Sequence, residues 1–234
     1  MLMPFFSTAA LRTHHDGTVE FVKWIALAAM LVDHVGLLVF GQGKFSLSDD
    51  VGRIAFPLFA FVLGFKLAAG SGSVSPTSLR TVKRLFLWAL ISFVPFYLAT
   101  GRLWPPDIFF TLGLGALACW VESSALPDRQ RWLAYLGIFI ASFGCDYFAP
   151  GVFLILSVCV LYRRSSASAA AATLLCCALL ALMSWNPWTL LALPIASSIH
   201  WLRLSVPRLK WLFYAIYPLH LLAIAVLVAF RPFK

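Results

Sequence analysis

Long hydrophobic runs separated by short polar stretches dominate the chain and restrict the folds open to it. Of the 234 residues, 62% are hydrophobic and only 12% are charged, whereas a typical soluble domain is about half apolar and about a quarter charged. A water-soluble fold cannot bury that much apolar surface, and a membrane-spanning helix needs about 20 mainly apolar residues. The sequence therefore predicts an all-α, polytopic integral membrane helical bundle.

Hydropathy divides the chain into about nine transmembrane segments, each bounded by glycine, proline or polar residues. The boundaries predict a single transmembrane domain over residues 18–234, preceded by a cytoplasmic N-terminal tail over residues 1–17. The predicted segments are residues 19–40, 51–69, 85–100, 108–121, 132–143, 148–162, 167–183, 188–201 and 211–230.

Lysine and arginine residues are distributed unevenly between the loops on the two sides of the predicted bundle. Because cytoplasmic loops carry the excess of these residues, the bias predicts a cytoplasmic N-terminus. The net charge of +9 is scattered between hydrophobic runs, so no nucleic-acid partner is expected, and the predicted partner is the lipid bilayer. The predicted cytoplasmic loops hold Arg80, Lys83, Arg84, Arg129, Arg131, Arg163, Arg164, Arg203, Arg208 and Lys210.

The fifth and sixth segments form a short hairpin. A helix over residues 132–143 rises only about 18 Å, less than the ~30 Å thickness of the hydrocarbon layer. Arginines at both far ends indicate that the hairpin starts and finishes on the same side. Irregular backbone is tolerated at membrane depth only where protein or a water-filled cavity covers it. The tip at Gly144, Cys145 and Asp146 is therefore predicted to line a cavity.

A few ionisable residues fall inside or at the edge of apolar segments, where charged groups are expensive and are functional candidates. Asp33 and His34 follow Lys23 by ten and eleven residues, and His220 follows Lys210 by ten, which places them about 15 Å from the same side. Our hypothesis is that side chains from separate helices surround one intramembrane cavity. The members of this set are Asp33, His34, Arg53, Asp107, Asp146 and His220.

Helix geometry limits the pairing within this set. Neighbouring residues on a helix point about 100° apart, so Asp33 is poorly placed to orient His34, and each needs a partner on another helix. Arg53 is the expected partner of one of the aspartates, either functionally or as a structural ion pair. The five cysteines include no CxxC pair, so they are interpreted as packing residues and no metal site is predicted.

Several motifs together resemble the TraX family, membrane proteins associated with N-terminal acetylation of conjugative pilin. They extend over most of the chain after residue 17, and the first, second and last are the most specific. Asp107 departs from the resemblance, since the family is expected to favour asparagine there. The motifs are K-x(6)-M-x-x-DH-x-G from Lys23 to Gly36, GRIAFPLFAF from Gly52, SFVPF ending at Phe96, FFTLGLG from Phe109, DY with a following PG at 146–151, and FYAIYPLH ending at His220.

The resemblance implies acetyl transfer from acetyl-CoA to an amine, such as the N-terminus of a pilin subunit. It implies no metal cofactor, and it implies a location in a bacterial inner membrane. A histidine with a pKa near 6.5 is suited to deprotonate the amine. His34 or His220 is expected to act as base or acyl acceptor. The other expected roles are orientation by Asp33 or Asp146, charge stabilisation by Arg53, coenzyme A binding by Arg80, Lys83, Arg84 and Lys210, and acceptor binding by Asp107, Thr111, Tyr147 and Tyr217.

A non-enzymatic reading of the same residues stays open. Buried aspartates and histidines suit a proton relay as well as catalysis. The alternative is therefore a membrane transporter or a pilus-assembly partner that uses these groups for proton or substrate handling. The acceptor, whether a peptide or a small amine, is also left open.

Overall fold

The computed structural model describes residues 16–69, 76–104 and 106–230, and in these ranges it contains helices and no strands. This confirms the predicted all-α class. The α-helices are α1 (Asp16–His34), α2 (Leu47–Gly52), α3 (Ala55–Ala69), α4 (Pro76–Thr100), α5 (Ile108–Ser123), α6 (Asp128–Ser142), α7 (Phe148–Arg164), α8 (Ala167–Ser184), α9 (Ala192–Ser197) and α10 (Lys210–Ala229); a π-helix, η3 (Val35–Val39), and two 3₁₀ helices, η4 (Pro187–Leu191) and η5 (Ser198–His200), complete the set.

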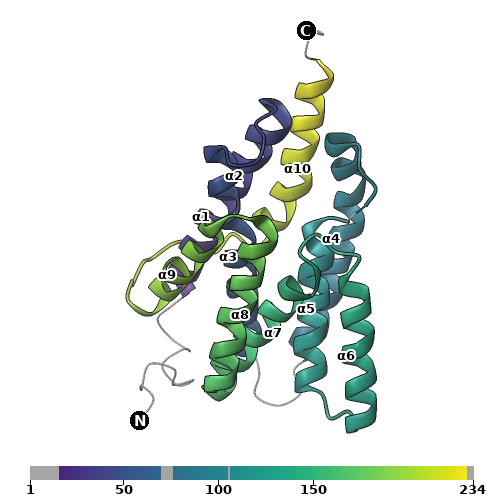
Figure 1. The fold of residues 1–234 in the computed structure, drawn as a ribbon, viewed down its shortest axis with the longest axis vertical. Coiled ribbons are helices and arrows are strands. Elements are labelled where there is room, and N and C mark those ends of the chain that lie inside the picture. The colour runs from purple at the N-terminus through teal and green to yellow at the C-terminus, as the bar shows by residue number, and fades with distance from the viewer. Residues whose placement is uncertain (1–15, 70–75, 105, 231–234) are drawn as a thin grey trace.

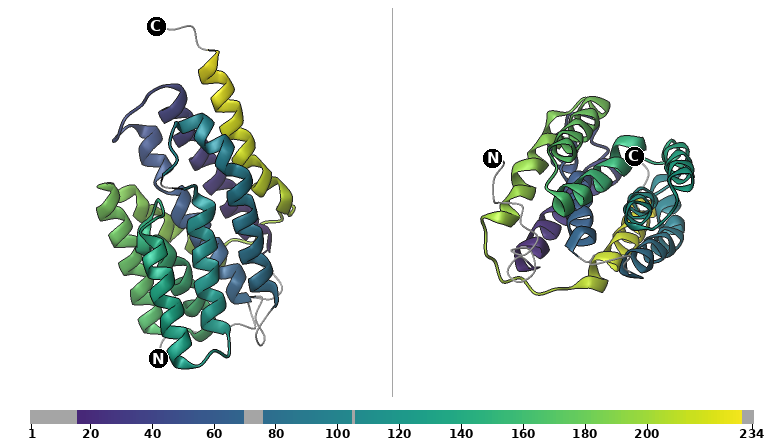
Figure 2. Two further views of the ribbon diagram at one scale, coloured as in Figure 1. Left: turned by 90° about the vertical axis from the view of Figure 1, so that its right-hand side faces the viewer. Right: turned by 90° about the horizontal axis from the view of Figure 1, so that it is seen from below.

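The long helices lie roughly parallel or antiparallel to one another in a single bundle (Figures 1 and 2). We call the end where α1, α4, α6, α8 and α10 begin the basal end, and the opposite end the distal end. Five helical stretches are long and apolar enough to cross a membrane, namely 17–39, 47–69, 79–100, 167–184 and 211–229. The chain is therefore a multi-pass membrane protein. The other four predicted segments are also helical but shorter, so the count of nine spans stays a prediction.

The eighth predicted segment, residues 188–201, is not one continuous helix. It consists of η4, α9 and η5 in succession, because Pro187 and Pro194 lack the N–H groups that a regular helix would use. The segment after it, residues 201–209, runs along the outside of the bundle to the start of α10 (Figure 2). The Thr18 hydroxyl at the start of α1 fastens this segment by donating to the Leu202 carbonyl over 2.8 Å and accepting from the Leu204 N–H over 3.1 Å.

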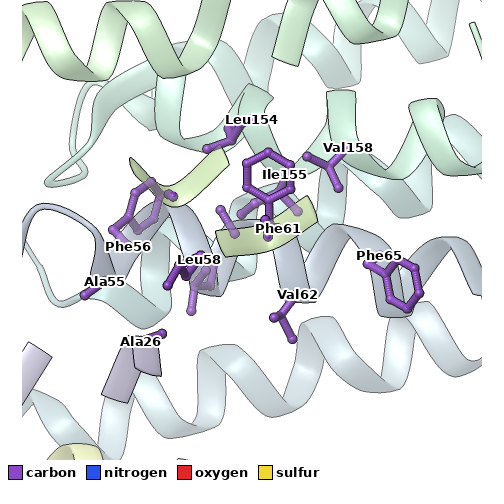
Figure 3. Packing of buried hydrophobic residues seen from close by; sticks show 14 of the residues in the cluster. Ala26, Ala55, Phe56, Leu58, Phe61, Val62, Phe65, Leu154, Ile155 and Val158 are labelled. Atoms are coloured by element: carbon purple, nitrogen blue, oxygen red, sulfur yellow. The ribbon is translucent and has the colours of Figure 1, made fainter. Parts of the chain in front are cut away.

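Helix α3 is the centre of the bundle. Buried apolar residues lie all round it, as expected of a helix surrounded by other helices. Its most extensive contacts are with α7, and Phe61 and Ile155 belong to the same buried apolar cluster (Figure 3). Two glycines permit this close packing: a Cβ at Gly64 would lie 2.7 Å from the Ile155 carbonyl oxygen, and a Cβ at Gly115 of α5 would lie 2.3 Å from the Ile155 side chain.

The outer helices expose apolar rather than polar side chains. Leu90 and Val94 of α4 are 67% and 59% exposed, and Trp132 and Ile140 of α6 are 73% and 62% exposed. Such faces are expected to contact lipid, because contiguous apolar surface on this scale marks a membrane or protein contact. All five cysteines are buried and none forms a disulfide, which confirms that they are packing residues.

The predicted hairpin is α6 and α7. Helix α6 begins at Asp128 rather than at Trp132, because hydropathy misses a polar first turn that lies at the membrane surface. With 15 residues it rises about 22 Å, still less than the ~30 Å hydrocarbon thickness. Of the three residues predicted to line a cavity at its tip, Asp146 does so, together with Tyr147 and Phe148, whereas Gly144 and Cys145 do not.

Candidate functional site

His34 and His220 meet side chain to side chain, although 186 residues separate them in the sequence. His34 is the last residue of α1 and His220 lies in α10, and the His34 Nδ1 atom lies 2.7 Å from the His220 Nε2 atom. The two rings are nearly parallel, with an interplanar angle of 9°. The structure therefore brings together the two histidines that the sequence placed at matching depth.

One backbone carbonyl group determines which nitrogen of each ring carries the proton. His220 Nδ1 lies 2.8 Å from the Ile216 carbonyl oxygen, and a carbonyl can only accept, so Nδ1 carries the proton. In a neutral imidazole the other nitrogen is then an acceptor. His220 Nε2 therefore accepts from His34 Nδ1–H, and this leaves His34 Nε2 with a free lone pair. No hydrogen-bond partner for Nε2 is found among the described residues.

Local structure at the end of α1 explains how His34 reaches its partner. The π-helix η3 follows His34 directly and contacts α10, and single π-helical turns occur frequently at functional sites. Gly36 lies inside it, where an added Cβ would be 2.2 Å from the Ser48 Oγ atom. A glycine at this position therefore lets the end of α1 lie directly against α2.

Aromatic rings pack around the histidine pair. Tyr217 of α10 is only 5% exposed, and its ring centroid lies 5.5 Å from that of His220 and 6.4 Å from that of His34. Phe109 of α5 covers the other edge of Tyr217 at 5.0 Å. These contacts exclude water from the pair and so strengthen its hydrogen bonds.

Asp33 lies on a different side of α1 from His34. A Cβ at Gly52 would lie 2.4 Å from the Asp33 Cβ atom, so Asp33 packs against the end of α2 and not against α10. Arg53 follows this helix end and pairs with Asp49, one turn earlier. The sequence analysis missed Asp49 as the partner of Arg53, although the i,i+4 spacing was a signal for it.

A cavity of about 140 Å³ lies at the distal end between α3, α7, α8 and η4. Arg53 and Asp146 are the two charged residues in its wall, and Asp33, His34, Asp107 and His220 do not line it. The hypothesis of one shared cavity is therefore wrong. His34 and His220 pair with each other, Arg53 and Asp146 line the cavity, and Asp33 and Asp107 belong to neither group. Other residues of the cavity wall are Phe56, Pro57, Tyr147, Phe148, Leu180, Met183, Ser184 and Thr189.

The cavity wall is rigid at the hairpin tip. The ring of Tyr147 stacks on Phe56 with centroids 3.7 Å apart. Phe148 has a φ of +46°, an outlier for a bulky residue that persists only where the surrounding structure fixes it. Strained backbone of this kind clusters at functional sites.

Asp107 caps α5. One carboxylate oxygen accepts from the Phe109 N–H over 3.1 Å, and the other accepts from the Ser92 hydroxyl. Burial raises the pKa of Asp107 to about 7, against the lowering effect of these bonds. Both oxygens of the Asp107 carboxylate therefore already have hydrogen-bond partners within the protein. Thr111, one turn into α5, is fully buried.

Asp146 lies exposed at the α6–α7 tip, where Arg102 interacts with it electrostatically. The titratable groups Asp107, Cys145, Tyr147 and Tyr217 also interact electrostatically with it. No hydrogen bond or ion pair to the Asp146 carboxylate is found among the described residues.

The predicted coenzyme A ligands gather at the basal end. Arg80 and Lys83 are exposed on the first turns of α4, and the Arg84 guanidinium lies 5.7 Å from the Trp211 ring and 5.8 Å from the Tyr214 ring. Lys210 begins α10, but its side chain lies outside what the structure describes.

Lys23 is a further basic residue at this end, to which the sequence analysis assigned no functional role. Its ammonium lies 4.4 Å from the Phe213 ring centroid and pairs with Glu20. Glu20 is fully buried, and its i,i+3 spacing from Lys23 was a signal for the pair.

These features define a multi-pass helical membrane protein with an intramembrane histidine pair. The chain belongs to the TraX family, since the family described as TraX protein matches residues 18–228. It is 28% identical over 153 residues to Protein TraX of Escherichia coli, an alignment that covers 63% of this chain and 57% of that protein. The chain thus spans less than two thirds of the length of this relative. No solved structure matches the chain.

Proposed function

We propose that this protein is an acetyltransferase that moves an acetyl group from acetyl-CoA to an amine, with His34 Nε2 as the reacting base. The observation that carries the proposal is the chain of hydrogen bonds from the Ile216 carbonyl through His220 to His34. It holds one imidazole in a single tautomer with its lone pair free. This is the arrangement that general base catalysis requires, in which a third group orients the base.

In the proposed reaction, His34 Nε2 takes a proton from the acceptor amine as the amine nitrogen attacks the thioester carbonyl. The C–N bond forms, the C–S bond breaks, and the proton passes from His34 to the departing thiolate. His220 stabilises the imidazolium through the Nδ1–H bond of His34. The same lone pair would accept the acetyl group if the transfer were relayed. His220 thus takes the orienting role for which Asp33 and Asp146 were the sequence-based candidates.

The basal end suits the phosphate groups of the donor. Arg80, Lys83 and Arg84 supply positive charge there, and the N-terminus of α10 is the positive end of its helix dipole, which favours anions. Tyr214, in contact with Arg84, precedes His220 by six residues, or about 9 Å of helix rise. A thioester arm that enters along α10 would therefore reach the histidine pair.

The basal location of these residues also supports an inner-membrane orientation with the start of α1 in the cytoplasm, where acetyl-CoA is found. The TraX resemblance supports the N-terminus of a conjugative pilin as acceptor. Asp107, Thr111 and Tyr147 remain candidates for acceptor contact, as does Tyr217 beside the histidines.

To test the proposal, the protein is reconstituted in lipid vesicles with labelled acetyl-CoA and a peptide that has a free N-terminal amine. His34→Ala is expected to lower the rate of acetyl transfer by about 10²–10⁴-fold, and His220→Ala by a smaller factor, since it removes only the orienting group. The matched control is His200→Ala, which removes a histidine that pairs with Tyr162 over 2.9 Å. His200→Ala is expected to stay within threefold of the wild-type rate.

Equal rates for the wild-type protein and both His34→Ala and His220→Ala would refute the histidine chemistry. Gradient-driven flux of a substrate without any acetyl transfer would refute the enzymatic assignment and favour a transporter.

A further inference from the structure

Residues 201–211, which follow η5 and include the first two residues of α10, have an exposed surface that is both apolar and basic. We call them the basal connection. Trp201 at one end is 72% exposed and Trp211 at the other is 63% exposed, so large apolar side chains lie beside charged ones. The exposed residues that define this surface are Trp201, Leu202, Arg203, Arg208, Leu209 and Trp211.

The backbone of the basal connection fixes its level in the bilayer. Residues 202–209 form neither helix nor strand, and irregular backbone that is exposed to lipid does not occur within the hydrocarbon region. Hydrogen bonds from Leu202 and Leu204 to Thr18 nevertheless hold the segment against the start of α1, on the outside of the bundle (Figure 2). Its exposed side chains therefore lie in the headgroup layer, where tryptophan rings and the long stems of arginine are favoured.

The charge of this surface has one sign. No aspartate or glutamate follows Asp146 in the sequence, so the basal connection carries positive charge only. Arg208 also interacts electrostatically with Lys23 of α1, which brings a second positive charge close to it. Guanidinium groups form paired hydrogen bonds with phosphate oxygens. The surface is therefore complementary in charge to a negatively charged headgroup.

We propose that the basal connection binds the headgroups of anionic phospholipids, with Arg203 and Arg208 as the phosphate-binding residues. Trp201 and Trp211 anchor its two ends in the headgroup layer. A zwitterionic phospholipid offers the same phosphate but carries a compensating ammonium group, so the arginines favour the anionic lipid. Each arginine beside an anionic membrane surface strengthens binding by a factor of about five.

This surface is independent of the proposed acetyl transfer, because neither arginine belongs to the histidine pair or to the residues assigned to the donor. The selectivity for lipid is therefore expected without acetyl-CoA and in the His34→Ala variant. A failure of the present inference is thus distinguishable from a failure of the proposed function.

The test measures which lipid lies next to the basal connection. All five native cysteines are buried, so Leu209→Cys provides an exposed thiol for a fluorescent label beside Arg208. The labelled full-length protein is reconstituted in phosphatidylcholine vesicles that contain brominated phosphatidylglycerol or brominated phosphatidylcholine at equal mole fraction. Brominated phosphatidylglycerol is expected to quench the label more strongly, with a local preference of about fivefold or more.

Two sets of variants in the labelled protein test the role of charge. Arg203→Gln/Arg208→Gln is expected to bring quenching by the two lipids to near equality, and Arg203→Lys/Arg208→Lys to retain most of the preference, since lysine keeps the charge. The matched control is Arg129→Gln, which removes an exposed arginine from the first turn of α6 at the same end. It is expected to leave the preference unchanged.

Competition with soluble anions identifies the source of the phosphate. Neither glycerol 3-phosphate nor coenzyme A is expected to reduce the preference for phosphatidylglycerol, because neither has an acyl chain to hold it in the bilayer. Loss of the preference with glycerol 3-phosphate would assign the arginines to a free phosphate, and loss with coenzyme A alone would assign them to the acetyl donor. Either result would overturn the proposal.

Three further results would also overturn it. Equal quenching by the two brominated lipids in the protein with both arginines would show that the surface does not select for anionic lipid. An unchanged preference in Arg203→Gln/Arg208→Gln would show that other residues cause the selection. An absence of quenching by either lipid would show that the basal connection projects into water.

Discussion

Replacing Gly64 with alanine should loosen the contact between the two central helices. An added Cβ would lie 2.7 Å from the Ile155 carbonyl oxygen and 2.9 Å from the Val158 Cβ and Cγ1 atoms, whereas optimal contacts between carbon atoms lie at about 3.5–4.0 Å. The nearest obstacle is backbone and cannot rotate away. Helices α3 and α7 must therefore separate by several tenths of an ångström along a tightly packed interface.

The magnitude follows from two opposing effects. Overpacking a well-packed core costs about 1–3 kcal/mol, while alanine is more favourable than glycine in a helix interior by roughly 0.5–1 kcal/mol. Gly64→Ala is therefore expected to lower the free energy of unfolding by about 1–2 kcal/mol. Gly137→Ala is the matched control, since a Cβ at Gly137 of α6 meets nothing within 4 Å. It should stabilise the protein by about 0.5–1 kcal/mol.

The assay is equilibrium unfolding in mixed micelles with increasing mole fraction of SDS, followed by circular dichroism. The two variants have the same change in composition, so the difference between them isolates the packing at the α3–α7 contact. If Gly64→Ala proves as stable as Gly137→Ala, close approach of α3 and α7 is not a determinant of stability and the reasoning fails.

A further prediction concerns Asp107. Asp107→Asn should retain acetyl transfer and stability, because its amide oxygen can still accept from the Phe109 N–H and its amide nitrogen can donate to Ser92. Asp107→Ala should lower the unfolding free energy by about 0.5–2 kcal/mol through loss of the cap. A large loss of activity in Asp107→Asn at unchanged stability would show that the charge takes part in the reaction.

Hydropathy and charge were sufficient to predict the helical membrane class and the positions of the helices. The clearest errors are at polar or proline-containing positions. Helix α6 begins at Asp128 because a polar first turn continues the helix beyond the apolar run, and the segment after Pro187 is broken into three short helices. Local periodicity does not report either effect, since the first depends on the position of the membrane surface and the second on backbone hydrogen bonding.

For the candidate site, matching depth along two helices predicted that His34 and His220 lie at one level. Depth alone did not establish that their rings touch, nor that Asp33 turns toward α2 while His34 turns toward α10. These outcomes depend on how each helix is rotated about its axis, and the packing of Gly36 and Gly52 against neighbouring side chains sets that rotation.

The sequence by itself determined that this chain is a multi-pass helical membrane protein, because so much apolar surface can be removed from water only in a bilayer. Its motifs also placed it in the TraX family. Only the tertiary structure decided that His34 pairs with His220, while Arg53 and Asp146 line a separate cavity. The physical reason is that side-chain partners are chosen by the rotation and close contact of helices distant in sequence, and hydrophobicity, which has no direction, cannot specify them.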